Sequence, residues 1–441
     1  MQRMMTRYLL ESAWLPNGWA DDVGVALQGG AFAEVVVGAP PDYGPSLRGR
    51  AIPGLPNLHS HLFQRAMAGL AERRGPGADS FWSWREVMYA FLARLDPEDM
   101  ESIAAMAMVE MLESGFTALA EFHYLHHQPD GTPYADPAEM AGRIAAAAAA
   151  TGMGLTLLPV LYSHGGFGPQ PPGPGQKRFL NATDAFLRLC DASARAIAPL
   201  ADARLGVAPH SLRAVTGTQI KELVAARPEG PLHIHVAEQV AEVEACLEWS
   251  GQRPVQHLLA TQPVDARWCL IHATHMAPAE ITDLAASGAV AGLCPITEAN
   301  LGDGLFPAAG YGGAWGVGSD SNVEISAPGE LRLLEYGQRL LHRGRNMMAR
   351  GEGRSTGEDL YRAALLGGTQ ACGRDIGRIE PGARADLVLL DLDATLDQFI
   401  FVRPRISRVM TGGVFVVEEG RHFARDQVAA GFARTMARLR G

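Results

Sequence analysis

Histidine and carboxylate residues that could ligate a metal ion recur along the chain. His59 and His61 stand one residue apart in IPGLPNLHSHL, so both side chains would point to the same side of a strand. His235 and Asp320 follow later apolar runs. Imidazole and carboxylate groups suit zinc, and a catalytic zinc site keeps one position open for water. These four residues therefore predict a site for one metal ion.

Each of these residues could instead be an ordinary hydrogen-bonded residue of a protein core. An isolated His-X-His pair in particular carries little information. The set is more informative because all its members fall at the ends of β-rich runs. His233 would share the strand face of His235, one layer deeper, which makes it the alternative ligand. We favour His235 because Glu238 follows it in HVAE.

The elements that must position these residues form a regular pattern between about residues 53 and 325. Short β-rich runs alternate there with segments of helical period such as DMESIAAMAMVEMLESG. The eight runs are IPGLPNLHSHL, FTALAEFHY, GLTLLPVLYS, RLGVAPHSL, PLHIHVAE, WCLIHATH, AVAGLCPI and AWGVGSDSN. This alternation predicts an α/β fold, a parallel (β/α)8 barrel of the TIM type. Reactive groups of such barrels lie where the strands end, as these residues do.

Further short strands are predicted at both ends of the chain. VGVALQGGAFAEVVVG near the start and ADLVLLDLD and RVMTGGVFVVEEG near the end indicate strands with glycine-rich turns. We expect them to combine into a small composite β-sandwich. Residues 1–52 would then be its N-terminal part, residues 53–375 the barrel, and residues 376–441 its C-terminal part with a terminal helix. The Gly/Pro-rich segment 164–179 predicts a loop over the barrel mouth.

The composition of the 441 residues restricts the partners and the cellular compartment. A net charge of −10 argues against a nucleic-acid or anionic-membrane surface. The five cysteines are scattered without a CxxC pair, which favours a reducing cytoplasm over a disulfide framework. No signal peptide or membrane-spanning apolar run is evident. Lys177 and Lys221 are the only lysines, so a carboxylate-binding site must be built from arginine.

Several motifs resemble those of a known family. PGLPNLHSHL, HVAE, LIHATH and GSDSN resemble the signature of the amidohydrolase superfamily in its aminohydrolase branch, and GRIEPGARADLVLLDLD resembles its composite β-domain. LHSHLFQRAMAGLAE, DSFWSWREVMYAF, AEFHYLHH, APHSLRAV and CPITEANLGDGLFP are similar to the formimidoylglutamate deiminases of histidine degradation. CPITEAN departs from the CPxSN of related deaminases and agrees with this narrower family. GVAPH lacks the lysine with which binuclear members bridge two metals, so a single metal is expected.

The resemblance implies a role for individual residues and an oligomeric state. It implies one zinc ion per subunit, or another divalent transition metal, and a homodimer. The implied metal ligands are His59, His61, His235 and Asp320. The implied catalytic residues are Glu238, His272 and Asp320. The implied substrate-binding residues are Gln64, Arg85, Tyr124, His210 and Arg213.

The implied reaction is hydrolysis of N-formimidoyl-L-glutamate to N-formyl-L-glutamate and ammonia. The reacting end of this substrate is cationic near neutral pH and suits Glu238, whereas its two carboxylates suit arginine. We expect Asp320 to take a proton from metal-bound water, and Glu238 to move a proton to the departing nitrogen. His272 would hold or polarise the attacking oxygen.

Two other functions stay open on the sequence. An aminohydrolase of the same superfamily could act on a purine, pterin or S-adenosylhomocysteine-like ring, for which aromatic walls and few cations are expected. An inactive oligomeric scaffold on the same fold is the other alternative, although such relatives usually lose metal ligands.

Some of the predicted roles also have alternatives. Arg85 lies on a predicted amphipathic helix, where a structural salt bridge, aromatic stacking or contact with a neighbouring subunit could replace a substrate contact. Other histidines near predicted strand ends receive no role: His123, His126, His127, His164 and His275.

Overall fold

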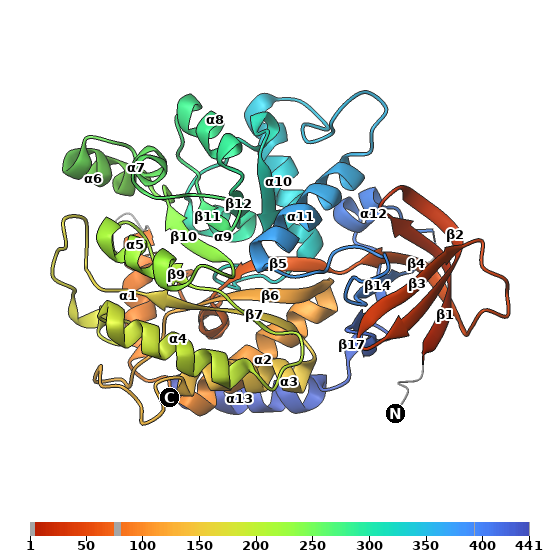
Figure 1. Ribbon diagram of the computed structural model, residues 1–441, viewed down its shortest axis with the longest axis horizontal. Helices are drawn as coiled ribbons and strands as arrows, with labels where there is room; N and C mark the ends of the chain where they lie inside the picture. Colours follow the sequence, from red (N-terminus) through yellow and green to blue (C-terminus); the bar gives the residue numbers. More distant parts are fainter. Residues whose placement is uncertain (1–4, 75–80, 392, 441) are drawn as a thin grey trace.

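The computed structural model describes residues 5–74, 81–391 and 393–440. The first two residues of the DSFWSWREVMYAF stretch, and the ends of the predicted N- and C-terminal parts, lie outside these ranges. Three hydrogen-bonded sheets and the helices around them make up the fold (Figure 1). No helix within the described ranges is long and apolar enough to cross a bilayer.

Two parallel sheets contain the strands after which the predicted site residues fall. The first has the order β5 (Leu55–Ser60), β6 (Phe116–His123), β7 (Gly154–Leu161) and β8 (Arg204–Leu205), with β9 (Ala208–Pro209) also paired to β7. The second has the order β10 (Leu232–Val236), β11 (Trp268–His272), β12 (Val290–Leu293) and β13 (Ala314–Val317). Strands covered on both faces need continuous apolar runs, which is the sequence pattern that predicted all eight positions.

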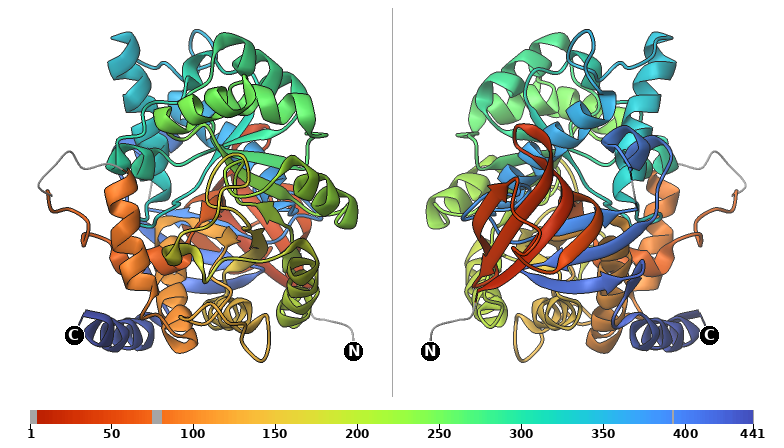
Figure 2. Two further views of the ribbon diagram at one scale, coloured as in Figure 1. Left: turned by 90° about the vertical axis from the view of Figure 1, so that its left-hand side faces the viewer. Right: turned by 90° about the vertical axis from the view of Figure 1, so that its right-hand side faces the viewer.

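Isolated parallel bridges join the two sheets at both of their edges. Ser60 pairs with Asp320 at one edge, and Ser211 pairs with His235 at the other. A fully buried cluster lies between the sheets, with Leu58 and Leu158 from the first and Ile271 from the second. The two sheets therefore share one interior, and the helices lie around their outside (Figures 1 and 2).

Local sequence signals set both ends of one long helix. α2 (Pro97–Ser114) starts at a capping box formed by Asp96 and Asp99 and stops at Gly115, whose φ is 102°. The remaining longer helices are α1 (Phe81–Leu92), α3 (Glu139–Thr151), α4 (Thr183–Ile197), α5 (Gly217–Ala226), α6 (Val240–Ser250), α7 (Pro254–Thr261), α8 (Pro278–Ser287), α9 (Pro295–Leu301), α10 (Ala327–His342), α11 (Thr356–Cys372), α12 (Leu396–Phe401) and α13 (Arg425–Arg440).

Strands from both ends of the chain share a third sheet, as the sequence predicted. The N-terminal strands are β1 (Thr6–Leu15), β2 (Gly18–Gln28), β3 (Ala31–Val37) and β4 (Ser46–Pro53), and the C-terminal strands are β14 (Leu387–Leu390), β15 (Ile406–Thr411), β16 (Val414–Glu418) and β17 (Arg421–His422). They form one mixed sheet of order β17-β16-β15-β14-β4-β1-β2-β3, joined where β14 pairs with β4 (Figure 2). The sandwich and the domain boundaries stay predictions.

Helix α11 packs so closely on the parallel sheets that it needs glycine at the contact. A Cβ atom on Gly367 would overlap the carbonyl of Trp315 and lie 2.8 Å from the backbone nitrogen of Gly316 in β13. The last residues of the same helix, Ala371 and Cys372, belong to the buried cluster between the sheets. The helix therefore closes the interior from the side opposite the site.

We expect Gly367→Ala to lower the free energy of unfolding by about 3 kcal/mol, because the new methyl group overpacks a backbone contact. Gly142→Ala is the matched control, since Gly142 lies in α3 with no atom within 4 Å of the added methyl group. This control should raise the free energy of unfolding by roughly 0.5–1 kcal/mol through helix propensity. Urea unfolding of both variants measures the difference, and equal effects would contradict the packing described for α11.

Candidate metal centre and active-site cavity

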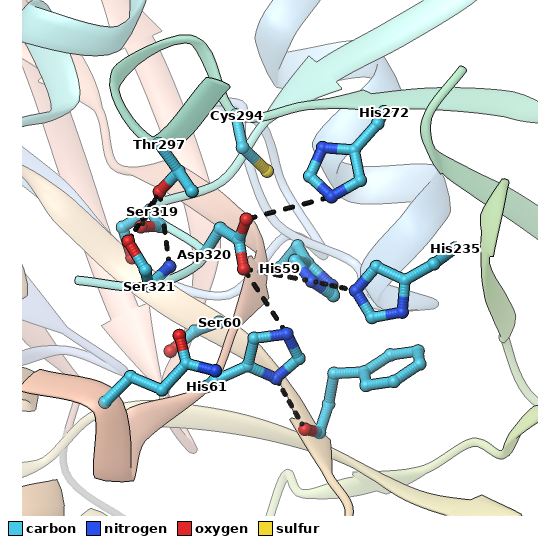
Figure 3. Close-up of polar contacts among 12 residues, drawn as sticks. His59, Ser60, His61, His235, His272, Cys294, Thr297, Ser319, Asp320 and Ser321 are labelled. Atoms are coloured by element: carbon cyan, nitrogen blue, oxygen red, sulfur yellow. Dashed lines mark hydrogen bonds and ion pairs between the residues drawn. The ribbon is translucent and has the colours of Figure 1, made fainter. Parts of the chain in front are cut away.

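The predicted metal ligands meet where strands of both parallel sheets end. His59 lies in β5, and His61 follows that strand at the start of a short 3-10 helix, Leu62–Met67. His235 lies in β10, and Asp320 follows β13. Figure 3 shows the Asp320 carboxylate pointing between the rings of His61 and His272. Residues that are far apart in the sequence thus converge on one point.

The spacing of the ligand atoms fits a tetrahedral metal site. The Nε2 atoms of His59 and His235 lie 3.1 Å apart, and Asp320 Oδ1 lies 3.3 Å from His61 Nε2 and 3.6 Å from His59 Nε2. Ligand atoms at about 2.0–2.1 Å from a tetrahedral zinc ion are separated by roughly 3.3–3.4 Å. His59, His61 and His235 form a metal site, in which all three side chains are buried.

Hydrogen bonds from the backbone orient two of the three imidazoles. The carbonyl oxygen of Phe122 accepts from His61 Nδ1 at 3.0 Å, and that of His210 accepts from His235 Nδ1 at 3.1 Å. Since a carbonyl can only accept, each Nδ1 carries the hydrogen and each Nε2 presents a lone pair. Burial lowers the pKa of His61 to about 3 and the pKa values of His59 and His235 well below their usual range. All three rings are therefore neutral, which is the form that binds metals.

His272 lies beside this site within a group of carboxylates. Its Nε2 atom is 3.7 Å from Glu238 Oε1 and 3.8 Å from Asp320 Oδ2, and its Nδ1 atom is 3.3 Å from Glu298 Oε1. Burial alone would lower the pKa of His272, but these three carboxylates raise it to about 10. His272 is therefore an imidazolium near neutral pH and can donate through both nitrogens.

Burial also shifts the pKa values of the neighbouring carboxyl groups. It raises the pKa of Asp320 to about 7, against the opposing effect of His272. It raises the pKa of Glu238 as well, while His272 and Arg213 lower it. A carboxyl group with a pKa of about 7, as in Asp320, can exchange protons near neutral pH, which is what acid–base chemistry requires.

A cavity lined by polar and aromatic side chains opens above these groups. Its floor contains His61, His235 and Asp320, together with Glu238 and His272. All the residues predicted to bind substrate line it: Gln64, Arg85, Tyr124, His210 and Arg213. The structure thus brings every predicted site residue to one cavity, apart from His59, which is fully buried beneath it.

The two arginines lie on different elements and have different partners. Arg213 follows the turn after β9, and its Nε atom lies 3.9 Å from Glu242 Oε1. Arg85 belongs to α1, and its guanidinium lies 5.6 Å from the ring centre of Tyr89. The aromatic contact that the sequence offered as an alternative for Arg85 is therefore present, and the side chain still lines the cavity of its own chain.

An aromatic wall of the cavity was not predicted from the sequence. It consists of Trp84, Tyr89, Tyr162 and Phe179 together with the predicted Tyr124. Tyr162 directly follows β7, so the strand-end rule could have found it. The irregular segment 164–179 does reach the cavity, because Phe179 at its end lines it.

Most of the histidines left without a role make backbone contacts, whereas the ring of His123 packs edge-on against that of His126. The rings of His126, His127 and His275 hydrogen-bond the carbonyl oxygens of Val160, Leu180 and Asp303, and His164 contacts Gln219. His233, the alternative to His235, hydrogen-bonds Ala371 O at 2.8 Å deeper between the sheets. His233 is therefore turned toward the end of α11.

The sequence profile of the amidohydrolase family matches residues 50–416. The chain belongs to the amidohydrolase family. It is 50% identical to a formimidoylglutamate deiminase of Pseudomonas aeruginosa over 99% of this chain and 100% of the relative. It is 30% identical to an 8-oxoguanine deaminase of the same species, over 84% of this chain and 82% of that protein.

Solved structures agree with this membership. An amidohydrolase from Brucella melitensis superposes with a TM-score of 0.95 at 50% identity, covering 99% of this chain and 100% of that one. An adenosine deaminase from Xanthomonas campestris, solved with bound zinc, has a TM-score of 0.81 at 21% identity, covering 99% of this chain and 98% of that one. At that identity the second likeness describes the fold alone.

We expect His235→Ala to abolish stoichiometric metal binding, because it removes one of three imidazole ligands. His233→Gln should retain the metal, since the amide can still donate to Ala371 O. Metal analysis by mass spectrometry after gel filtration compares the two variants with the unchanged chain. Metal loss from His233→Gln with retention by His235→Ala would reverse the assignment.

Proposed function

We propose that this family member is a metal-dependent deiminase that hydrolyses N-formimidoyl-L-glutamate to N-formyl-L-glutamate and ammonia, in histidine degradation. The observation that supports it best is that the groups needed for this reaction line one cavity. The cavity combines the metal site, two shifted carboxyl groups and two arginines. The 50% identity to a formimidoylglutamate deiminase over the whole chain supports the same substrate.

The metal of this site is proposed to be one zinc ion per subunit, with Asp320 as the fourth protein ligand. The distances from Asp320 Oδ1 to His59 and His61 support this ligand set. When bound, zinc would lower the pKa of a coordinated water from 15.7 toward about 7 and so supply a nucleophile near neutral pH. Another divalent transition metal with the same ligand preference remains the alternative.

Different side chains around the metal site carry out the different proton transfers. Asp320 would hold the metal, and its carboxylate would take the proton of the attacking water; its Oδ2 atom faces His272 Nε2 at 3.8 Å. His272 donates a hydrogen bond to the oxygen that attacks the formimidoyl carbon. Glu238 pairs with the amidinium and delivers a proton to its terminal nitrogen, which leaves as ammonia. The formyl oxygen comes from water, and the hydroxyl proton of the intermediate is lost as the C=O bond forms. The proton taken by Asp320 replaces the one that Glu238 gave, so amidinium and water yield the formyl group, ammonia and one proton.

The remaining cavity residues suit the anionic end of the substrate. Arg213 and Arg85 can form charge-assisted hydrogen bonds to the two carboxylates. Gln64 Nε2 donates to the hydroxyl of Tyr124 at 2.9 Å, and this hydroxyl donates in turn to Met88 Sδ at 3.5 Å, a weak acceptor that a ligand oxygen can replace. His210 completes this side of the cavity, and burial lowers its pKa well below the usual range.

The proposal also covers the architecture of the fold, the oligomeric state and the cellular compartment. The bridges at both sheet edges support a closed (β/α)8 barrel over residues 53–375. Residues 1–52 and 376–441 would form the composite β-sandwich. We further propose that the protein forms a homodimer, as the resemblance implies. We also propose that it lies in the cytoplasm, since its five cysteines are all free and buried.

The aromatic wall supports a ring-shaped substrate as the second candidate. Rings stack on such walls, and the identity to an 8-oxoguanine deaminase points the same way. The two arginines oppose it, because a neutral ring offers them no carboxylate for charge-assisted hydrogen bonds. The scaffold alternative is opposed by the complete set of proposed metal ligands.

An ammonia-release assay decides among these candidates. Zinc-loaded protein is given N-formimidoylglutamate, N-formimidoylaspartate, guanine or S-adenosylhomocysteine in parallel. We expect the highest kcat/KM with N-formimidoylglutamate. Preference for either ring would overturn the proposed substrate, and metal-loaded protein inactive on all four would favour the scaffold.

We expect Glu238→Gln to lower kcat by at least roughly 100-fold, because the amide cannot transfer a proton. Glu244→Gln is its control, since Glu244 is exposed on the neighbouring helix α6. The control should keep the turnover of the unchanged enzyme. Steady-state ammonia release measures both, and near-normal turnover by Glu238→Gln would remove Glu238 from the mechanism.

A further inference from the structure

Glu242 is a buried carboxylate just outside the set of residues discussed so far. It lies in the first turn of α6, the helix that follows β10 and the HVAE stretch. Its side chain is 1% exposed. It forms part of a second hollow next to the active-site cavity, and the two hollows share the side chains of Arg85, Tyr162 and Arg213. Glu242 therefore lies behind the cavity wall.

One oxygen of Glu242 fixes the backbone at the proposed proton donor. Oε2 accepts a hydrogen bond from the backbone N–H of Glu238 at 3.1 Å. This N–H precedes the helix, where no helical carbonyl is available to accept from it. The residue before it, Ala237, has a φ of 54°, an uncommon conformation that needs support from its surroundings. Glu242 thus restrains the segment that carries Glu238.

The other oxygen of Glu242 faces Arg213. Oε1 lies 3.9 Å from Arg213 Nε, and it has no hydrogen-bond partner among the residues that the structure describes. Arg213 is itself 16% exposed, toward the cavity. Burial alone would lower the pKa of Arg213, while the carboxylates of Glu242 and Glu238 raise it. A carboxylate behind the guanidinium keeps the cation stable where little water reaches it.

We propose that Glu242 is a positioning residue for both ends of the substrate, holding Glu238 through its backbone and Arg213 through its charge. It sets the distance between the group that protonates the leaving nitrogen and the cation that binds a substrate carboxylate. This proposal rests on the proposed function, because it assigns the substrate's carboxylate to Arg213.

A purely structural role in helix capping makes a different prediction. A carboxylate at the third helical position often accepts from a backbone N–H near the helix start. Glutamine has the same shape and its amide oxygen accepts the same hydrogen bond, but it carries no charge. Glu242→Gln therefore keeps the hydrogen bond to the Glu238 backbone and removes the charge, which attracts Arg213 and also raises the pKa of Glu238.

Glu280 provides a matched control on the neighbouring helix α8. It occupies the third helical position there, is buried, accepts from Ala277 N at 2.7 Å and pairs with Arg253 Nε at 2.6 Å. It does not line the active-site cavity. Glu280→Gln therefore reproduces the loss of a buried, capping, arginine-paired carboxylate without touching the substrate site.

The test measures kcat and KM for N-formimidoylglutamate in zinc-loaded Glu242→Gln, Glu280→Gln, Arg213→Met and the double variant Glu242→Gln/Arg213→Met. We expect Glu242→Gln to raise KM about tenfold with kcat changed less than about threefold, as for a weakened charge contact to substrate. Glu280→Gln should leave both constants unchanged. In the Arg213→Met background, Glu242→Gln should change KM by less than roughly twofold, because the two residues act together.

Several outcomes would overturn the proposal. A normal KM in folded, zinc-loaded Glu242→Gln would reduce Glu242 to a helix cap, and equal KM effects in Glu280→Gln would show a general loss of stability. If Glu242→Gln does not fold, Glu242→Asp replaces it, because aspartate keeps the charge. The KM of Glu242→Asp should rise less than about threefold. A rise of about tenfold or more would contradict the role of charge. An unchanged chain without activity on this substrate would instead refute the proposed function.

Discussion

The constraint on which the site depends is the burial of many ionisable side chains around one point. His59, His61 and His235 are neutral there because desolvation disfavours their charged forms. His272 is the exception, since three carboxylates keep it charged. The same low-water surroundings that would penalise an isolated charge strengthen each pair within the cluster. A metal ion fits among such groups because it needs neutral imidazoles and an ionised carboxylate.

The fold imposes this cluster through the ends of its strands. Parallel strands of two sheets end on one side, and bridges such as Ser60 to Asp320 bring the first and last of them together. His272 and Asp320 both adopt left-handed backbone conformations, with φ values of 69° and 44°. Such residues cost on the order of 1–3 kcal/mol each, which the packed strands beneath them offset. The backbone is thus strained at the residues proposed for catalysis.

Much of this arrangement could be predicted because it is encoded locally. Continuous apolar runs identified the strands, and the alternation of side chains put His59 and His61 on one face. Residues that follow strands, such as His210 directly after β9 and Asp320 three residues after β13, were found from the same apolar runs. One of the three carboxylate partners of His272 was not, because Glu298 reaches it from helix α9, a contact that only the folded chain creates. Glu298 stands in CPITEAN, so its departure from CPxSN was the available signal.

The aromatic wall and the composite sheet show where local patterns were insufficient. Trp84 and Tyr89 come from a helix, and Phe179 comes from an irregular segment, so their place over the strand ends depends on tertiary packing. The pairing of β14 with β4 joins segments more than three hundred residues apart. The sequence predicted that the two ends would combine, but strand order depends on long-range contacts that periodicity does not contain.

The central claim is that one bound metal ion at this cluster supports deimination. Metal-free protein titrated with zinc, while ammonia release from N-formimidoylglutamate is followed, tests it most directly. The account predicts no turnover without metal and a rise that ends at one equivalent of zinc per chain. Full turnover in metal-free protein, or a rise that continues to two equivalents, would contradict it.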